Sequence, residues 1–345
     1  MTTLSGPDGT QSSVGSGPAW LAAWPIAYPH VHRSWTVRSP NGAAWATLTP
    51  ETGEVEPVEP AGDRRLPGLA VALRSGRLVA YRAGRRAVVR SQPSQTKPGS
   101  FIKVVRPSRV DGVVRTHQRL FAANLPAMIP RVLQFDDDGR IGLEALPGPS
   151  VHDLFRSTSH REPSIPVEQI AEALSCVHRI EPEGNPRPDD PPEKWVAMVG
   201  RAEPNMIEPL QEVASQLPSL PAAEPAVIHG DLHDKNILLG ERSIALIDLD
   251  GVKTGAAEDE LANLGVHLQL RCLQSGRPIA YGQSLAARLY RRYGEIRTVS
   301  PSRIDAAERH VWFRLACLYR FRVSSRPLVP DLLHLAAGGS QASSR

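Results

Sequence analysis

The spacing of apolar residues predicts two different parts in this chain. Before residue 147, short apolar runs alternate with turns rich in Pro, Gly, Asn and Asp, a pattern typical of β-strands joined by tight turns. After residue 147, apolar residues recur every three or four positions, as they do on one face of an amphipathic helix. We therefore expect a β-rich amino-terminal part followed by a mainly helical part.

These patterns predict the individual elements and their grouping. We expect strands over residues 34–37, 44–48, 54–58, 78–82, 85–90, 101–105, 130–135 and 140–146, and a helix over 113–124. Further helices are expected over residues 151–155, 167–180, 195–217, 258–273, 279–294 and 302–323. The domain prediction is a disordered segment 1–18, a β-rich N-lobe 19–146 with an amino-terminal extension, a helical C-lobe 147–338 and a frayed tail 339–345.

Length and composition restrict the class of protein. A chain of 345 residues can form two lobes with separate cores. No run approaches ~20 apolar residues, so we expect no membrane-spanning segment, and the amino terminus lacks the pattern of a signal peptide. The formal net charge of +4 is small and the arginines are not interleaved with aromatic residues, which argues against nucleic acid as a partner.

The cysteines suggest the compartment. Cys176, Cys272 and Cys317 lie far apart and show no metal-ligand spacing. Each has apolar neighbours in a helix-like pattern, so we expect buried free thiols. Free thiols persist in a reducing environment, which predicts a cytoplasmic protein. The sequence does not determine the oligomeric state.

One polar loop between two apolar runs carries the clearest chemistry. It reads His229-Gly230-Asp231-Leu232 and continues to Asn236, and the next apolar run, 244–247, is followed by Asp248. The loop matches the kinase pattern H-R-D-L-x-x-x-N, with Gly in place of Arg. Phosphoryl transfer needs one carboxylate for the attacking hydroxyl, and an amide oxygen and a second carboxylate for Mg²⁺. The spacing predicts Asp231 as the catalytic base and Asn236 and Asp248 as Mg²⁺ ligands.

The stretch 228–238, together with Leu246-Ile247-Asp248-Leu249-Asp250-Gly251, resembles the aminoglycoside phosphotransferase and choline kinase-like family. The resemblance covers about residues 75–330, and it is strong at 228–264 and weak elsewhere. It implies an α+β, two-lobed protein-kinase-like fold with a small β-rich N-lobe and a larger helical C-lobe. It also implies transfer of the γ-phosphoryl group of ATP to a hydroxyl of a small-molecule substrate, with ATP and Mg²⁺ as cofactors. Asp250 becomes a candidate for a further site carboxylate.

The resemblance also assigns nucleotide-binding residues in the N-lobe. Lys103 lies in the middle of an apolar strand, where an unpaired ammonium is costly, and the family pattern implies that it contacts the α- and β-phosphates. Residues 144–147 are implied as the hinge against the adenine, through backbone groups of Glu144 and Leu146. No G-x-G-x-x-G is present, so Gly84 in the hairpin turn is the best phosphate-loop candidate, although a lone Gly in a turn is commonly only a turn.

Four features depart from the family pattern. The helix after the lysine strand usually carries a Glu that pairs with the lysine, but no Glu occurs between residues 59 and 144. Lys103 is therefore paired differently, or held only by nucleotide phosphates. The family segment G-D-P-x-x-D-L-A reads G-A-A-E-D-E-L-A at 255–262, with Glu260 in the last acidic place. Asp234-Lys235 replaces the Pro-Gly often found in the loop, and the glycine-rich loop is missing.

Charge and motif content bear on the acceptor and on rival functions. Residues 252–345, where such folds build the acceptor site, contain seven Asp and Glu against fourteen Lys and Arg. A polycationic aminoglycoside favours an acidic wall, so a sugar, a nucleoside-like or an anionic acceptor is favoured. The alternative is a nucleotide-binding pseudokinase with a regulatory or scaffold role. The missing helix Glu and glycine-rich loop favour it, and the intact Asp231, Asn236 and Asp248 oppose it. A protein kinase is less consistent, because no A-P-E segment follows Asp248.

Overall fold

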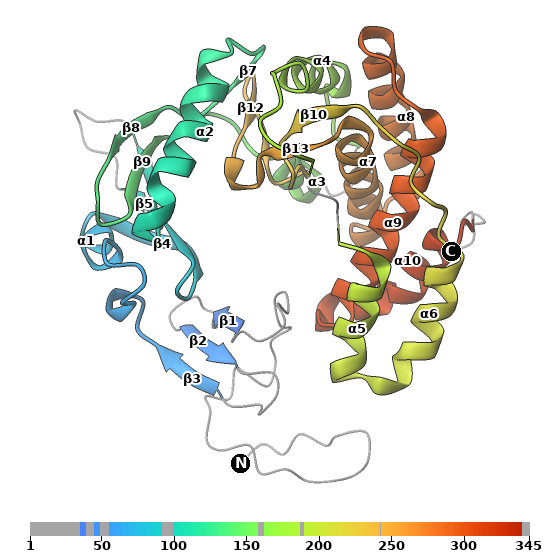
Figure 1. Cartoon of the computed structure of the whole chain (residues 1–345), viewed down its shortest axis with the longest axis horizontal. Coiled ribbons are helices and arrows are strands. Elements are labelled where there is room, and N and C mark those ends of the chain that lie inside the picture. Colours follow the sequence, from blue (N-terminus) through green and yellow to red (C-terminus); the bar gives the residue numbers. More distant parts are fainter. Residues whose placement is uncertain are drawn as a thin grey trace.

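The computed structural model describes residues 35–38, 45–48, 55–91, 99–157, 162–186, 190–241 and 243–339. A sheet-rich part built from the amino-terminal residues faces a helical part built from the carboxy-terminal residues (Figure 1). This is the mixed α+β, two-lobed arrangement expected from the sequence, and we call the two parts the N-lobe and the C-lobe.

A five-stranded antiparallel sheet forms the N-lobe. Its strand order is β4-β5-β6-β9-β8, and every neighbouring pair is antiparallel. The strands, and the two helices that pack on them, are β4 (Gly76–Arg82), β5 (Arg86–Ser91), β6 (Ser100–Val105), β8 (Val132–Phe135), β9 (Arg140–Glu144), α1 (Leu69–Arg74) and α2 (Val110–Ala122).

The two faces of this sheet pack against different helices, and this difference shows on which face Lys103 lies. On one face, Ala87 and Val89 of β5 pack in a buried cluster with Leu69 of α1. On the other face, Val105 of β6 packs in a cluster with residues of α2. Because side chains alternate along a strand, Lys103 lies on the same face as Val105. The lysine therefore projects from the face that α2 covers.

A separate three-stranded antiparallel sheet precedes the N-lobe sheet. It has the order β1-β2-β3, with β1 (Trp35–Arg38), β2 (Trp45–Leu48) and β3 (Val55–Val58). The ring of Trp45 meets the ring of Tyr81 in β4 edge to face, with centroids 5.3 Å apart. The strands agree with the sequence prediction, and the aromatic contact attaches them to the N-lobe.

The C-lobe is helical. Its helices are α3 (Val151–Ser157), α4 (Val167–Val177), α5 (Pro192–Ala202), α6 (Ile207–Ser215), α7 (Ala257–Gln274), α8 (Ile279–Ile296), α9 (Pro301–Tyr319) and α10 (Val329–Ala336). Helix α7 packs against both α8 and α9, and α4 packs against α8. Cys272 and Cys317 are buried and Cys176 is half-buried, and all three are free thiols. None of the described helices is long and apolar enough to cross a membrane.

Short strands hold the segment that contains the predicted catalytic residues. They are β7 (Ala127–Met128), β10 (Pro225–Ile228), β11 (Ile237–Leu239), β12 (Ile244–Leu246) and β13 (Lys253–Ala256). β10 pairs with β13 and β11 pairs with β12, both antiparallel, while β12 pairs with β7 in parallel. The loop between β10 and β11 therefore has both of its ends held in strands.

The short strands β7 and β13 lie in stretches where no element was predicted, and the structure differs from the predicted helices in three further places. The single helix expected over 195–217 is two helices, because Pro204 lacks an amide donor and Glu203 before it leaves the helical region (φ −138°, ψ 79°). Helix α1 was missed because six residues are too few for a clear helical period, and α10 because Pro327 and Pro330 obscure its start. The predictions for residues 1–18 and 340–345 lie outside the described residues.

Replacing a core leucine of the C-lobe should destabilise the protein strongly. Leu174 of α4 is fully buried, so Leu174→Ala removes buried methyl groups and leaves a cavity, at a cost of about 2–5 kcal/mol in the free energy of unfolding. The matched control is Leu133→Ala in β8, where the side chain is 52% exposed and the expected change is below about 0.5 kcal/mol. Urea denaturation measures both, and similar small losses in the two variants would contradict the described core.

Candidate active site

The predicted catalytic loop joins β10 to β11 and is braced by its own hydrogen bonds. Asn236 Nδ2 donates to the carbonyl oxygen of Asp231 at 2.9 Å, and the Asn236 backbone amide donates to the carbonyl oxygen of His233 at 2.9 Å. Asn236 is buried, whereas Asp231 is exposed. Because the side-chain nitrogen of Asn236 is occupied, its amide oxygen remains as a ligand atom.

Asp248 lies beside Asn236 because β11 and β12 pair. The Ile247 amide donates to the Asn236 carbonyl oxygen at 3.0 Å, which extends the ladder to the residue before Asp248. Asp248 has φ 60° and ψ 55°, a left-handed conformation that costs a non-glycine residue about 1–2 kcal/mol. Strain of this kind persists mainly at functional positions. Here it turns the chain from β12 into the short helix η5 (Leu249–Gly251).

Lys103 reaches the carboxylates of Asp248 and Asp250. Its Nζ lies 3.1 Å from Asp248 Oδ1 and 2.5 Å from Asp250 Oδ1. Arg86 of β5 contacts the same two carboxylates, each at 2.9 Å. Burial acts to raise the pKa of Asp248, but the charges of Lys103 and Arg86 outweigh it and hold that pKa below its usual range. These ion pairs identify the partners of a lysine side chain that is only 4% exposed.

Helix α2, beside Lys103, contains a histidine but no glutamate. His117 is buried, and its Nδ1 lies 3.1 Å from the carbonyl oxygen of Pro130, so Nδ1 carries the proton and donates it. In the described part of the chain, His117 Nε2 has no hydrogen-bond partner. Burial lowers the pKa of His117, and the charge of Lys103 acts in the same direction, so the ring is neutral. The partners of Lys103 thus come from the segment after β12 instead of from α2.

A fully buried carboxylate, Glu260 of α7, holds the start of the loop. It accepts hydrogen bonds from the amides of His229 at 3.1 Å and Gly230 at 2.8 Å, and from His178 Nε2 at 2.9 Å. His178 in turn has its Nδ1 2.8 Å from the hydroxyl of Tyr293. Burial acts to raise the pKa of Glu260, but the bond from His178 outweighs it and lowers that pKa. The residue in the last acidic place of the 255–262 segment is therefore an anchor for the loop.

The backbone explains why the loop has Gly where the protein-kinase pattern has Arg. Gly230 has φ 77°, and a Cβ at this position would lie 2.2 Å from the carbonyl oxygen of Gly251. Only glycine fits this close approach. His229 beside it donates from Nε2 to the carbonyl oxygen of Ile247 at 2.8 Å, so it helps to orient the loop.

Asp234 belongs to the loop and stands where the family pattern has Pro-Gly. Its side chain is completely buried. Its Oδ2 accepts hydrogen bonds from Arg271 Nε at 2.6 Å and from His152 Nδ1 at 2.9 Å. Burial acts to raise the pKa of Asp234, but the bond from His152 and the charge of Arg271 hold it below its usual range. Asp234 therefore ties the loop to α3, which contains His152, and to α7, which contains Arg271.

The other predicted nucleotide-binding residues lie at the hinge and at the β4–β5 turn. Glu144 ends β9, and its side chain contacts Arg131 at 3.1 Å. Leu146 follows it and is half-buried, and within the described residues its backbone groups form no hydrogen bond, so they are available to a ligand. The amide of Gly84 already donates to Asp63 at 2.6 Å. Phosphate binding by Gly84 stays a prediction, and this amide would first have to leave Asp63.

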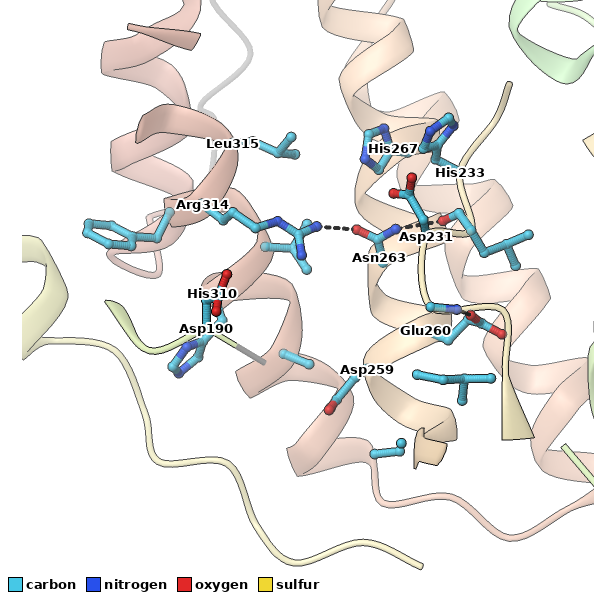
Figure 2. A pocket seen from close by; sticks show the side chains of 18 of the residues that line it. Asp190, Asp231, His233, Asp259, Glu260, Asn263, His267, His310, Arg314 and Leu315 are labelled. Atoms are coloured by element: carbon cyan, nitrogen blue, oxygen red, sulfur yellow. Dashed lines mark hydrogen bonds between the residues drawn. The ribbon is translucent and has the colours of Figure 1, made fainter. Parts of the chain in front are cut away.

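A pocket of about 940 Å³ opens beside Asp231 and runs between α7 and α9 (Figure 2). Its walls come from the catalytic loop, β13, α7, α9 and the segment before α5. Figure 2 shows Asp231 and His233 on the loop, opposite Arg314 of α9. The pocket can hold a small molecule with a hydroxyl group next to Asp231.

The residues around Asp248 fit a Mg²⁺–nucleotide. Mg²⁺ prefers oxygen ligands and is commonly held by one or two protein groups together with substrate phosphates. Asp248 and Asn236 offer a carboxylate and an amide oxygen, and Lys103 and Arg86 place positive charge beside them. Among the described residues, no group of three or more His, Cys, Asp or Glu side chains is arranged to hold a metal ion. Nucleotide phosphates would therefore complete the coordination.

Arg86 was not identified from the sequence, although part of its signal is present. Val88 lies opposite Lys103 in the β5–β6 pairing, and Arg86 is two residues before Val88, so both cations lie on one face of the sheet. The alternation of Arg86 with the buried Ala87 indicates the same face. The contact with Asp248, 162 residues away in sequence, required the tertiary structure.

Replacing Glu260 by Gln should make folding less sensitive to acid. Folding lowers the pKa of Glu260, so its stabilisation is fully present above the usual Glu pKa of about 4.3 and is lost as the pH falls through the lower pKa of the folded state. We expect Glu260→Gln to lower the free energy of unfolding by about 1.5–3 kcal/mol near pH 7, and the deficit to shrink below about pH 4.3.

Urea denaturation across this pH range measures the deficit of Glu260→Gln. The control is Glu295→Gln, which removes a carboxylate that is 52% exposed and paired with Arg292 on the surface of α8. Its effect should be small at every pH. A Glu260→Gln deficit that stays constant between neutral and acidic pH would contradict the role of the buried charge.

Comparisons with solved structures agree with this fold. An amicoumacin kinase in complex with AMP-PNP and Ca²⁺ has a TM-score of 0.56 at 10% identity, covering 81% of this chain and 94% of that one. A choline/ethanolamine kinase family protein from Mesorhizobium loti has a TM-score of 0.51 at 13% identity, covering 81% and 92%. An ethanolamine kinase from Plasmodium vivax has a TM-score of 0.50 at 13% identity, covering 78% and 83%. At these identities the likeness concerns the fold alone.

Sequence comparison identifies the family. No curated protein matches the chain. The profile described as "Phosphotransferase enzyme family" matches residues 78–302, well over half of the 345 residues. The matched range includes Lys103, the catalytic loop and Asp248. The chain therefore belongs to the phosphotransferase enzyme family.

Proposed function

We propose that this chain transfers the γ-phosphoryl group of ATP to a hydroxyl group of a small molecule. A continuous line of contacts from Lys103 to Asp231 carries the proposal. Lys103 forms an ion pair with Asp248. Ile247, the residue before Asp248, is hydrogen-bonded to Asn236, and Asn236 is hydrogen-bonded to Asp231. The nucleotide side of the site and the proton acceptor are thereby held in a fixed relation, on which transfer between two bound groups depends.

Each residue has a role that its position supports. Asp231 borders the pocket and accepts or orients the proton of the attacking hydroxyl. Asn236 and Asp248 hold Mg²⁺, which when bound neutralises charge on the phosphates. Lys103 binds the nucleotide phosphates, and the backbone at Glu144 and Leu146 meets the adenine.

The ion pairs of Lys103 and Arg86 support the proposed role of Asp248 as a Mg²⁺ ligand. In the structure both cations pair with Asp248 and Asp250. They keep Asp248 ionised, which a Mg²⁺ ligand requires. Asp248 would hold the metal ion, and Lys103 and Arg86, which lie on one face of the sheet, would then be available to bind the phosphates.

The charge of the acceptor pocket supports a preference among acceptors. Six Lys and Arg residues line the pocket against four Asp and Glu residues, namely Lys235, Lys253, Arg271, Arg303, Arg314 and Arg322 against Asp190, Asp231, Asp259 and Glu260. Positive walls repel a polycation, so a sugar, a nucleoside-like or an anionic acceptor is favoured over an aminoglycoside.

The cytoplasm is the proposed location of this reaction. The three cysteines are free thiols, and two of them are buried in helices α7 and α9. Free thiols of this kind are usual in reducing compartments, where ATP is available to a kinase.

A nucleotide-binding pseudokinase is the alternative. Two observations favour it. Two cations pair with Asp248, and Mg²⁺ would have to displace them. Helix α2 also has no glutamate that could hold Lys103 instead. The exposed Asp231 at the edge of the pocket favours the enzyme, because a binding module needs no proton acceptor there.

Replacing Asp231 by Asn separates these two functions. We expect Asp231→Asn to lower kcat by about 10²- to 10⁴-fold, because the variant loses general-base assistance, while the Kd for Mg–ATP stays within about twofold. The assay measures ADP release with an acceptor found in a broad metabolite screen, and calorimetry measures nucleotide binding.

The control for this variant is Asp305→Asn, which changes an exposed residue of α9 outside the pocket lining and should leave both quantities unchanged. Unchanged turnover in Asp231→Asn would show that Asp231 is not the base. A wild-type protein that binds Mg–ATP but phosphorylates nothing in the screen would establish the pseudokinase.

A substrate panel tests the preference among acceptors. We expect kcat/KM for kanamycin to be lower than kcat/KM for neutral sugars, because the cationic pocket walls repel a polycation. Steady-state ADP release gives both values. Efficient phosphorylation of kanamycin, with kcat/KM above that of the sugars, would refute the preference.

A further inference from the structure

The acidic residues that line the acceptor pocket are largely neutralised by other groups. Asp259 of α7 pairs with Arg303 of α9 at 2.7 Å. Glu260 is buried and holds the loop, and Asp190 pairs with Lys194 at 2.6 Å. These carboxylates are therefore not available to balance the remaining cations of the pocket.

Arg314 of α9 is a pocket cation whose partner is neutral. Its Nη2 donates to the amide oxygen of Asn263 at 2.5 Å, and within the described residues it forms no ion pair. A guanidinium has five N–H donors, so most of its bonding capacity remains. The side chain is only half-exposed, which makes an uncompensated charge less favourable than on the open surface.

The position of Arg314 relates it directly to the catalytic loop. In Figure 2 its guanidinium reaches from α9 across the pocket toward Asn263 of α7. Asn263 Nδ2 in turn donates to the carbonyl oxygen of Leu232 at 2.6 Å, the residue after Asp231. Arg314 is thus two hydrogen bonds from the loop, and it borders the same pocket as Asp231. One small molecule can contact both residues.

The groups around Arg314 add to the excess of positive charge. Lys235 of the catalytic loop, Lys253 of β13 and Arg322 after α9 line the same pocket. An anion that binds in the pocket is attracted by these cations as well as by Arg314.

We propose that the acceptor is a hydroxylated anion whose carboxylate or phosphate group binds Arg314 while its hydroxyl lies at Asp231. The inference rests on the proposed phosphotransfer and narrows the acceptor to one charge class. An arginine–anion pair is charge-assisted and commonly bidentate, so it orients the bound molecule as well as holding it. Orientation of the hydroxyl toward Asp231 is what the transfer requires.

The test uses neutral polyols and their anionic derivatives as probes for the full-length protein. Three series share a carbon skeleton within each series: glycerol, glycerate and glycerol 3-phosphate; ribitol, ribonate and ribitol 5-phosphate; glucitol, gluconate and glucitol 6-phosphate. Calorimetry with saturating Mg–ADP keeps the nucleotide site filled, so that the probes report on the acceptor pocket. We expect at least one anion to bind about tenfold or more tightly than its neutral parent, and the two anionic arms distinguish carboxylate from phosphate.

Variants of Arg314 connect this preference to the residue. In Arg314→Ala the anion-to-parent affinity ratio should fall about 10- to 100-fold, and Arg314→Lys should recover part of it, because lysine keeps the charge but not the planar fork. If Arg314 only supported the loop through Asn263, both ligands of a pair would weaken equally and the ratio would not change. Arg291→Ala removes an exposed arginine of α8 outside the pocket lining and is the matched control, with an unchanged ratio.

Four outcomes decide the inference. It is overturned if no anion binds more tightly than its neutral parent, or if the preference survives in Arg314→Ala. Anion binding that depends on Arg314, in a protein that phosphorylates no acceptor, would keep the anion site and reject the phosphotransfer proposal instead. Phosphorylation of neutral acceptors in preference to all of the anions would support phosphotransfer and reject the anion site.

Discussion

A fully buried carboxylate, Glu260, is the constraint on which the catalytic region depends. A buried charge costs several kcal/mol unless hydrogen bonds and an opposite charge offset it. Glu260 has the amides of His229 and Gly230 on one side and His178 on the other. It therefore joins the loop to the end of α4 and to α7, and the close approach of Gly230 to Gly251 completes the arrangement. The loop is positioned by these groups before any ligand arrives.

Two clusters of charges contact this loop and have different roles. In the first, Asp234 of the loop is completely buried and pairs with Arg271 and His152, so this cluster stabilises the fold. In the second, Lys103 and Arg86 share the partly exposed carboxylates of Asp248 and Asp250. In the proposed function this second cluster exchanges partners with a metal ion and phosphates, because the side chains of Asp248 and Asp250 are 31% and 24% exposed. The same chemistry of paired charges thus stabilises one side of the loop and prepares the other for a ligand.

The proposed acceptor pocket differs from the proposed nucleotide site in what determines its selectivity. The fold is shared with kinases whose names specify quite different acceptors, so the fold carries no information about the acceptor here. Selectivity must lie in the residues that line the pocket. In this chain those include a guanidinium, Arg314, whose protein partner is a neutral amide that is itself bonded to the catalytic loop. Charge recognition and loop geometry are therefore connected through one asparagine.

The sequence by itself predicted the strands of the two amino-terminal sheets, most of the helices, the polar loop after β10 and the unusual lysine of β6, because each depends on neighbours within a few residues. It also showed that α2 lacks a glutamate, but it could not show what replaces it. The partners of Lys103 lie 145 and 147 residues away, and those of Asp234 lie 37 and 82 residues away. Only the packing of sheet against loop and helix against helix brings such residues together. The roles of Arg86 and Arg314 were decided there, since a charged residue on a predicted strand or helix has no defined partner until the tertiary structure supplies one.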